Sequence, residues 1–153
     1  MRAIFISLAV VSTLAGCGTV RLADSAQSAA IKAKGPSPDL GHIFVCRNGM
    51  LGAAIRPTIE LDGTPIAVIG KGTYSFTEVA PGSHTLVAKT PEHNSKLQFD
   101  IAAGEQKYFQ TWVSMGVFVG WGIIDNFPPA EGKKCVSESD LVEPETTVKT
   151  ATK

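Results

Sequence analysis

A run of short β-forming segments, separated by Gly, Pro, Asn and Asp, begins at His42 and most constrains the fold. In the stretch PTIELDGTPIAVIGKG, Ile59 and Leu61 alternate with polar residues, as in a strand with one buried face. The Asp62-Gly63 pair that follows is a strong signal for a two-residue hairpin turn. This stretch therefore predicts two antiparallel strands joined by a tight turn.

Similar segments recur along most of the chain, for example HIFVCR, TYSFTEV, HTLVAKT and KLQFDIA. Their near-regular spacing, with no convincing amphipathic helix among them, is typical of sandwiches and barrels and not of parallel α/β folds. The sequence predicts an all-β fold, a small antiparallel β-sandwich of about eight strands, with a small barrel as the alternative.

Length and charge limit the classes of function. The chain has 153 residues, which suits one modest domain. Its 14 Lys and Arg are balanced by 14 Asp and Glu, so no overall field attracts nucleic acid. We expect a single domain and no nucleic-acid partner.

The N-terminus has the pattern of a secretory leader. Arg2 precedes the apolar run AIFISLAVVSTLAG, which fits a signal peptide and is marginal for a membrane span. The run ends in LAGC, which resembles the bacterial lipobox. The resemblance implies cleavage between Gly16 and Cys17, a diacylglyceryl group on the Cys17 sulfur and an acylated new N-terminus. An uncleaved anchor and an ordinary secretory leader are alternatives that fit this boundary less well.

The residue after the cysteine bears on the destination. In lipoproteins of this type, Asp after the modified Cys tends to retain the protein at the inner membrane, and here the residue is Gly18. Two or three acyl chains anchor a protein stably in a bilayer. We expect an outer-membrane lipoprotein that faces the periplasm, with the bilayer as partner through Cys17 and no cofactor beyond the covalent lipid.

Two cysteines remain once Cys17 is assigned. Cys46 and Cys135 form an even pair in an oxidising compartment, so we predict a disulfide between them. Two buried free thiols are the alternative. No CxxC motif or nearby His suggests a zinc site at either cysteine.

Composition divides the chain into four segments. Residues 1–16 are the predicted signal peptide, and residues 17–40, rich in Ala and Ser and broken by Pro36 and Pro38, are predicted to be a lipidated N-terminus and flexible linker. Residues 41–136 form the predicted β-sandwich, and the polar residues 137–153 are a predicted disordered tail. The most apolar stretch, Trp112 to Ile124, is expected to be core strands, with an exposed apolar patch at Val117 to Trp121 as the alternative.

Several of these short strand and turn segments occur together, in the same order, in a group of bacterial lipoproteins. The stretches IFVCR, IELDG, GTY, VAPGSHTL and KYF, behind a lipobox, resemble a domain-of-unknown-function family that is similar to PEGA-like β-sandwich modules. The resemblance covers residues 41–132 or so. It implies a small, envelope-anchored, all-β domain and carries no catalytic residues over to this chain.

A search for chemistry finds no catalytic or metal motif. GKG lacks the spacing of a phosphate-binding loop, there is no G-x-S-x-G elbow, and the three histidines are not at metal-ligand spacing. The turn with Pro81 and Gly82, the neighbouring His84, and the loop with Glu92 and His93 are candidate contact sites. His84 shares a strand face with Leu86 and Ala88. We therefore expect it to be a hydrogen-bonded, partly buried histidine and not a metal or substrate ligand.

These observations favour a non-enzymatic binding or structural module that contacts an envelope protein or peptidoglycan. Two alternatives from other classes are an enzyme that acts on the cell wall and a carrier of a small ligand or metal. A deep polar cleft with a buried Glu or His would favour the enzyme.

Overall fold

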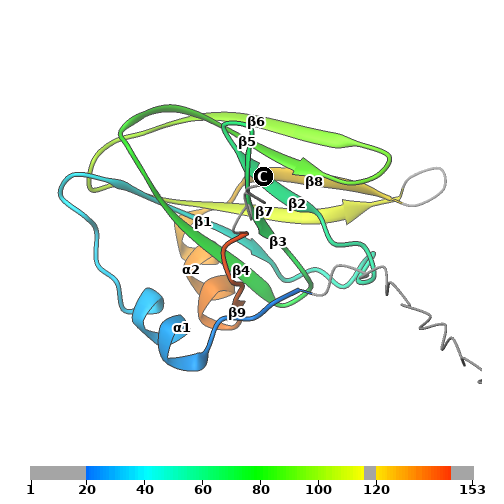
Figure 1. The fold of residues 1–153 in the computed structure, drawn as a ribbon, viewed down its shortest axis with the longest axis horizontal. Coiled ribbons are helices and arrows are strands. Elements are labelled where there is room, and N and C mark those ends of the chain that lie inside the picture. The colour runs from blue at the N-terminus through cyan, green and yellow to red at the C-terminus, as the bar shows by residue number, and fades with distance from the viewer. Residues whose placement is uncertain (1–19, 116–119, 146–153) are drawn as a thin grey trace, which may run out of the picture.

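A computed structural model describes residues 20–115 and 120–145, and this part of the chain folds as a β-sandwich with two short helices on one side (Figure 1). Five strands form one sheet, in the order β8-β7-β1-β4-β9, and four form the other, in the order β3-β2-β5-β6. The elements are α1 (Ser25–Lys32), β1 (Gly41–Arg47), β2 (Thr58–Leu61), β3 (Thr64–Val68), β4 (Thr73–Val79), β5 (Gly82–Lys89), β6 (Asn94–Ile101), β7 (Gln106–Ser114), β8 (Trp121–Asn126), α2 (Pro129–Ser137) and β9 (Asp140–Leu141).

The prediction of an all-β sandwich is confirmed, but the larger sheet is not purely antiparallel. Strand β1 pairs antiparallel with β4 and parallel with β7, and β4 pairs parallel with β9. Each parallel pair joins strands that are far apart in the sequence: β4 and the four-stranded sheet lie between β1 and β7, and helix α2 is part of the connection from β4 to β9. Strand β1, in the middle of its sheet, is buried along its whole length.

The hairpin predicted at Asp62-Gly63 joins β2 to β3. Asp62 has φ 50° and Gly63 has φ 82°, the left-handed pair that a type I′ turn requires. The register between the two strands shifts at Ile59/Glu60, which is a bulge next to the turn. The turn follows from local sequence.

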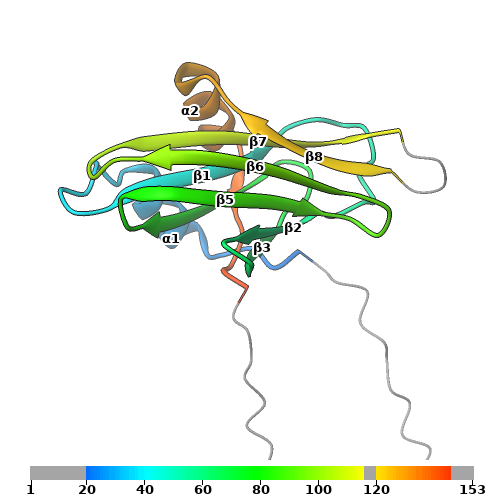
Figure 2. The ribbon, with the colours of Figure 1, turned by 90° about the horizontal axis from the view of Figure 1, so that it is seen from above.

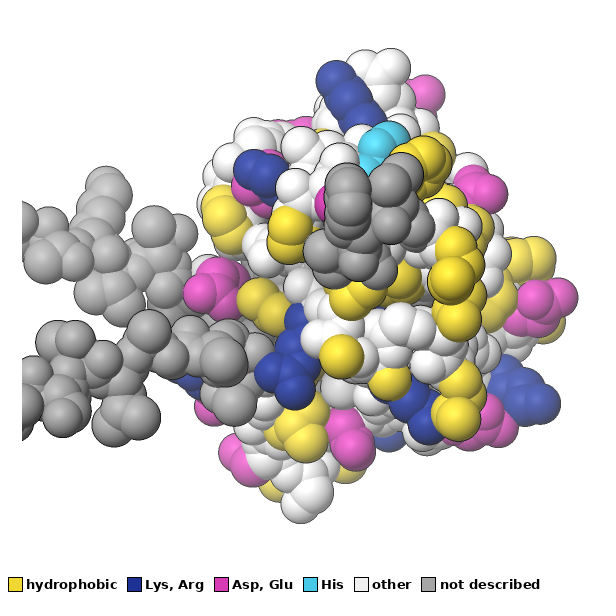
Figure 3. Space-filling view, turned by 90° about the vertical axis from the view of Figure 1, so that its right-hand side faces the viewer, with side chains coloured by type: hydrophobic (Ala, Val, Ile, Leu, Met, Phe, Trp, Pro, Cys, Tyr) yellow, Lys and Arg dark blue, Asp and Glu magenta, His cyan; other side chains and the backbone are white. Residues whose placement is uncertain are grey.

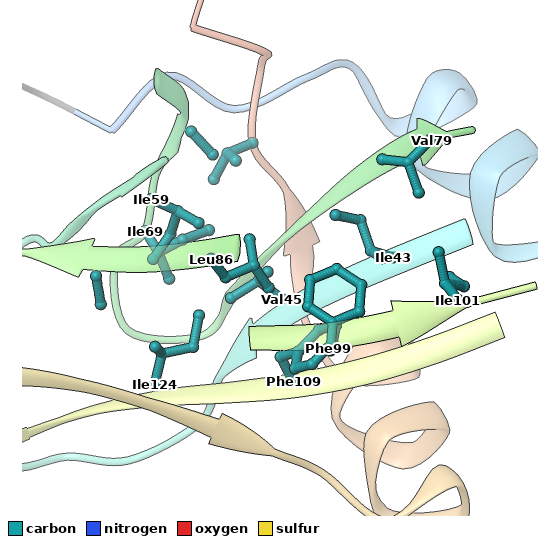
Figure 4. Packing of buried hydrophobic residues seen from close by; sticks show 13 residues of the cluster. Ile43, Val45, Ile59, Ile69, Val79, Leu86, Phe99, Ile101, Phe109 and Ile124 are labelled. Atoms are coloured by element: carbon teal, nitrogen blue, oxygen red, sulfur yellow. The ribbon is translucent and has the colours of Figure 1, made fainter. Parts of the chain in front are cut away.

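The main core lies between the two sheets. Inward side chains of both sheets interdigitate there, and most of the cluster is aliphatic, with the Phe99 and Phe109 rings in tilted contact at a centroid distance of 4.7 Å (Figure 4). The predicted inward face of β6 is confirmed for Phe99 and Ile101, which are buried, while Leu97 packs partly exposed against the same cluster. Burial of this kind stabilises a fold by about 25 cal/mol per Å² of apolar surface.

A second apolar cluster lies on the outer face of the five-stranded sheet, under the helices. It includes Phe44, Tyr74 and Tyr108 from the sheet and Val136 from α2. Helix α2 begins with Pro129 at its first turn, a position that suits proline because the first N–H groups of a helix have no partner within it. The expectation of a body without helices is wrong here, because a nine-residue helix is too short to show a clear apolar period.

The predicted flexible linker over residues 17–40 is wrong for its described part. Helix α1 is capped by Asp24, whose carboxylate accepts a hydrogen bond from the Gln27 backbone N–H at 2.7 Å. Ser28 is buried, with its hydroxyl 3.3 Å from the Tyr74 hydroxyl, and Ile31 packs against the second cluster. Small side chains here allow a close approach of the helix to the sheet, so their size favours docking.

The predicted disordered tail over residues 137–153 is also wrong for its described part. Residues Leu141 and Val142 are buried, and the Val142 N–H donates to the Tyr74 carbonyl at 2.9 Å. The Glu143 N–H donates to the Arg21 carbonyl, also at 2.9 Å. Two apolar residues in a polar segment suffice to add a strand when a sheet edge is available for pairing. The two described ends of the chain therefore lie side by side (Figure 2).

An arginine at the end of β1 organises the long connection to β2. The Arg47 side chain is fully buried, and its guanidinium donates to the backbone carbonyls of Leu51, Gly52 and Ile55 at 2.6 to 3.1 Å. Burial lowers the pKa of Arg47. These hydrogen bonds fix residues 48–57 against the end of the sheet.

The long apolar stretch folds as the hairpin β7-β8. Trp112 pairs with Ile123 and Ser114 pairs with Trp121. Val113 and Ile124 are buried, which confirms core strands, whereas Trp121 is exposed. Residues 117–119 of the alternative apolar patch lie outside the described residues. Neither helix in the described part of the chain has the length and apolar character needed to cross a membrane.

Candidate functional site

A groove opens between α1 and α2 on the outer face of the five-stranded sheet. It has a volume of about 330 Å³, within the range of small-ligand sites. Its floor is formed by β1 and β7, and its rim by the two helices and the segment after α1. The lining residues, which we call the lysine-aromatic groove, are Lys32, Lys34, Phe44, Gln106, Tyr108, Lys133, Val136 and Ser137.

The floor of the groove is aromatic. The rings of Phe44 and Tyr108 stack at 4.9 Å with an interplanar angle of 10°, because parallel β1 and β7 place these residues in register. Phe76 from β4 extends the aromatic surface, 5.1 Å from Phe44. Burial raises the pKa of Tyr108, so its hydroxyl stays protonated and lies 3.5 Å from Gln106 Oε1. Because Phe44 and Tyr108 are only 3% and 7% exposed, the floor presents a small apolar area at the bottom of the groove.

The rim of the groove is basic. Lys32 and Lys34 contribute from the α1 side and Lys133 from α2, and no Asp or Glu is among the lining residues. Lys34 Nζ is 3.0 Å from Glu78 Oε1 and 5.5 Å from the centre of the Phe76 ring. The Lys34 ammonium lowers the pKa of Glu78, so that carboxylate is ionised and offsets one of the positive charges.

Lys32 is held by backbone carbonyls at the end of α2. Its ammonium donates to the carbonyls of Ser137 and Ser139 at 3.2 and 2.8 Å and lies 5.7 Å from the centre of the Tyr74 ring. Ser137 ends α2, where the helix dipole favours a cation. Because carbonyls carry no net charge, Lys32 and Lys133 leave the groove positive. The arrangement suits a ligand that combines an anionic group with an apolar part.

A buried histidine lies beside the groove. His42 at the start of β1 is fully buried, and its Nε2 donates to Glu78 Oε1 at 3.0 Å. Its ring meets Phe76 edge-on at 5.2 Å, and its Nδ1 has no hydrogen-bond partner in the structure. Glu78 is thus shared between His42 and Lys34. This contact orients the carboxylate that in turn holds Lys34 at the rim.

The predicted cysteine pair is joined in the structure. A disulfide connects Cys46 on β1 with Cys135 on α2, with a Cα–Cα distance of 6.3 Å. The Ser139 hydroxyl lies within 3.5 Å of the Cys46 sulfur. The bond ties α2 to the central strand, and so fixes Lys133 and Val136 over the groove floor.

The candidate contact loops are not brought together. Gly82 lies at one end of the β5-β6 hairpin, opposite Ile101, and the loop with Glu92 and His93 closes the other end. Gly82 begins β5 with φ 142°, a backbone conformation that favours glycine. At the other loop, the Glu92 carboxylate accepts from the Gly120 N–H at 3.3 Å, and the His93 ring lies 5.2 Å from the Trp121 ring.

His84 has the structural role expected for it. Its Nδ1 lies 2.7 Å from Asp62 Oδ2 and its Nε2 lies 2.8 Å from the Ala80 carbonyl, so both nitrogens face acceptors. The hydrogen bond to Asp62 raises the pKa of His84, and the same bond lowers that of Asp62. Asp62 Oδ1 also accepts from the Thr85 N–H. His84 therefore braces the β2-β3 turn against β5, and a polar hollow of about 370 Å³ lies beside it.

Two further predictions concern lipid and metal. Gly16 and Cys17 lie outside the described residues, so cleavage and lipid attachment there stay predictions. Within residues 20–115 and 120–145, no three His, Cys, Asp or Glu side chains come together as metal ligands.

The groove itself was missed from sequence. Lys32 and Lys34 lie in a segment interpreted as a linker, and Lys133 lies in one interpreted as the end of a strand domain. The only local signal is the pair of polar-aromatic segments HIFVCR and KYF, whose alternate residues line the floor once the strands are parallel neighbours. Neither segment alone predicts that the two strands pair side by side.

Comparison with known proteins places the chain in a family. A family model described as a protein of unknown function, DUF2846, matches residues 38–122, more than half of the chain. The chain belongs to the DUF2846 family. The match runs from just before β1 to the start of β8, so it includes Phe44, Gln106 and Tyr108 of the groove floor and leaves out the lysines of the rim.

A curated relative extends the similarity of this DUF2846 protein beyond that match. An uncharacterized protein of Haemophilus influenzae is 25% identical over 142 residues, which cover 92% of this chain and 83% of the relative. No solved structure matches. The prediction of a domain-of-unknown-function family is thus confirmed, whereas the likeness to PEGA modules stays a prediction.

Proposed function

We propose that this DUF2846 protein is a lipid-anchored lipoprotein of the bacterial envelope that acts as a non-catalytic binding module. The lipid on Cys17 places it at the membrane, on the outer membrane facing the periplasm, and the lysine-aromatic groove is its binding site. The Cys46–Cys135 disulfide supports this location, because such bonds persist in oxidising compartments.

The observation that carries the binding role is the charge and shape of the groove. Lys32 and Lys133 face an aromatic floor of Phe44 and Tyr108. At about 330 Å³ the groove suits a short peptide or a sugar-linked acid and not a folded domain. Within the envelope, the peptide stems of peptidoglycan carry carboxylates next to apolar side chains. We therefore propose peptidoglycan stem peptides as the ligand class.

The test measures binding of purified soluble muropeptides by calorimetry. Lys133 is exposed on the rim, so Lys133→Glu is expected to leave the fold intact and to weaken binding about tenfold, which corresponds to about 1.4 kcal/mol. Lys96→Glu on β6 makes the same charge change on the opposite sheet and is the matched control. Binding should also weaken with added salt, because the rim charges are exposed to solvent.

Two results would reject the groove as the binding site. One is equal muropeptide affinity in the Lys133→Glu and Lys96→Glu variants. The other is an envelope protein, captured by crosslinking in intact cells, whose capture is unaffected by Lys133→Glu. The anchor is tested separately with Cys17→Ser, which should move the protein out of the membrane fraction. Unchanged fractionation would reject lipidation.

A further inference from the structure

Four of the five exposed large hydrophobic side chains of the described residues gather at one end of the sandwich, and the fifth, Leu22, pairs with Val142. Met50 and Leu51, which follow β1, are 73% and 57% exposed, and Met115, which follows β7, is 79% exposed. Trp121, 39% exposed, begins β8 opposite Ser114. Because β1 and β7 are parallel and β8 returns from the end of β7, all four lie at the same end of the sheet. We call these four residues the apolar end.

The apolar end is a built surface and not a set of scattered side chains. Arg47 holds the segment that carries Met50 and Leu51 in place through three carbonyls. A Cβ added at Gly52 would lie 2.6 Å from Val113, so this segment packs tightly on the end of β7. Figure 3 looks onto this side of the molecule, where many hydrophobic side chains face the viewer with both basic and acidic side chains among them.

The chain enters the fold next to this end. Val20 packs on Gly70, since a Cβ at Gly70 would lie 3.0 Å from a Val20 methyl. Lys71 follows Gly70 in the chain. Its ammonium lies 2.6 Å from the sulfur of Met50, a residue of the apolar end. Val20, the first described residue, is thus linked through Gly70 and Lys71 to Met50 of the apolar end.

The distance from Val20 to the predicted anchor is short. Only three peptide steps separate Cys17 from Val20, and they can span at most about 11 Å in any conformation. The headgroup layer of a bilayer is about 5 to 7 Å thick on each side. A lipidated Cys17 therefore holds the folded domain within reach of the headgroups. The long linker expected from the sequence, which would have kept the domain clear of the membrane, is absent from residue 20 onward.

We propose that the apolar end is a membrane-contact surface that rests on the bilayer carrying the anchor. Met50, Leu51, Met115 and Trp121 insert among the headgroups, where aromatic and long apolar side chains are favoured, and Lys71 contacts lipid phosphates. This inference rests on the proposed lipidation of Cys17. Contact through the apolar end would fix how the domain is oriented on the membrane, which the lipid on Cys17 alone would not.

The orientation explains where the groove points. Strand β1 runs from His42, paired with Gln106 of the groove, to Arg47 at the apolar end. Its seven residues span about 20 Å at 3.3 Å per residue. With the apolar end on the bilayer, the lysine-aromatic groove opens toward the periplasm, where a polymeric ligand can reach it.

Fluorescence quenching by brominated lipids tests the orientation. The full-length lipidated protein is reconstituted in vesicles of phosphatidylethanolamine and phosphatidylglycerol that contain an acyl-brominated phosphatidylcholine. The chain has two tryptophans, so Trp112→Phe leaves Trp121 as the reporter. We expect the brominated lipid to remove most of the Trp121 emission. The control reporter is Asp39→Trp, at an exposed position near the start of β1, in a chain that also carries Trp112→Phe and Trp121→Phe. It should be unquenched.

A charge placed in the surface provides the second measurement. Leu51→Asp should restore most of the Trp121 emission while the protein stays bound to the vesicles through its lipid. Ala102→Asp, at an exposed turn before β7, adds the same charge at the opposite end and should change nothing.

The outcomes separate this inference from the proposed function. Equal quenching of Trp121 and of the position-39 reporter, in protein that remains on the vesicles, overturns the orientation and leaves the anchor intact. Loss of quenching by the Ala102→Asp variant as well as by Leu51→Asp also overturns it. Failure of Cys17→Ser to release the protein in cells would instead remove the anchor on which the orientation depends.

Discussion

Removal of the disulfide gives the best-defined stability prediction. The Cys46–Cys135 bond closes a loop with a sequence separation of 89 residues. The chain-entropy relation gives a loss of about 15 cal/mol/K for a loop of about 90 residues, which is about 4.6 kcal/mol at 25 °C. Measured values often fall below that limit, so we expect the Cys46→Ala, Cys135→Ala double variant to lose about 3 to 4.5 kcal/mol of unfolding free energy. Urea unfolding followed by circular dichroism measures the change.

The comparison uses a Cys17→Ser background, so that no free thiol complicates either protein. Each single variant should be destabilised about as much as the double variant, because either one breaks the bond. Reduction of the parent chain should produce the same midpoint. A double variant that loses less than about 1 kcal/mol would refute the loop-entropy argument and indicate that the unfolded chain without the bond keeps structure of its own.

Three further changes test separate parts of the fold. Leu141→Ala should cost about 2 to 4 kcal/mol in urea unfolding, because Leu141 is buried in the second cluster; a loss below about 0.5 kcal/mol would contradict its assignment to the core. Arg47→Met should cost about 2 to 3 kcal/mol and increase hydrogen exchange in residues 48–57, because three carbonyls lose their donor; unchanged exchange would show that packing alone holds this segment. The hydrogen bond from Asp62 raises the pKa of His84, so the bond stabilises the fold fully below about pH 6.5 and this stabilisation is lost as the pH rises through the folded pKa of His84. Asp62→Asn should therefore reduce the pH dependence of the melting temperature. An unaltered pH profile in that variant would show that the contact between Asp62 and His84 is not its source.

The proposed orientation and the groove together describe how a small module can work at a membrane. The apolar end and the predicted lipid would hold one end of β1 at the bilayer, and the groove lies toward the other end of the same strand. The disulfide and the Lys32 contacts keep both helices on the groove floor. The ligand would therefore meet a rigid site at a fixed distance from the membrane.

Local sequence was sufficient wherever one short segment determines its own conformation. The turn at Asp62-Gly63 follows from residues that tolerate positive φ, and the inward face of β6 follows from alternation. The hydrogen-bonded His84 was also predictable from its position on a strand face. The disulfide was predictable because assigning Cys17 to the lipobox left two cysteines, and an oxidising compartment favours a bond between them.

Only the tertiary structure decided which segments are neighbours. Parallel pairing of β1 with β7 brings Phe44 onto Tyr108, and the docking of α1 and α2 brings Lys32 and Lys133 over them. The same applies to residues 20–40 and 137–145, which have little apolar surface of their own and gain order from an edge and a face that other strands provide. The physical reason is that alternation and turn chemistry act over a few residues, whereas the groove and the apolar end depend on contacts between residues far apart in the chain.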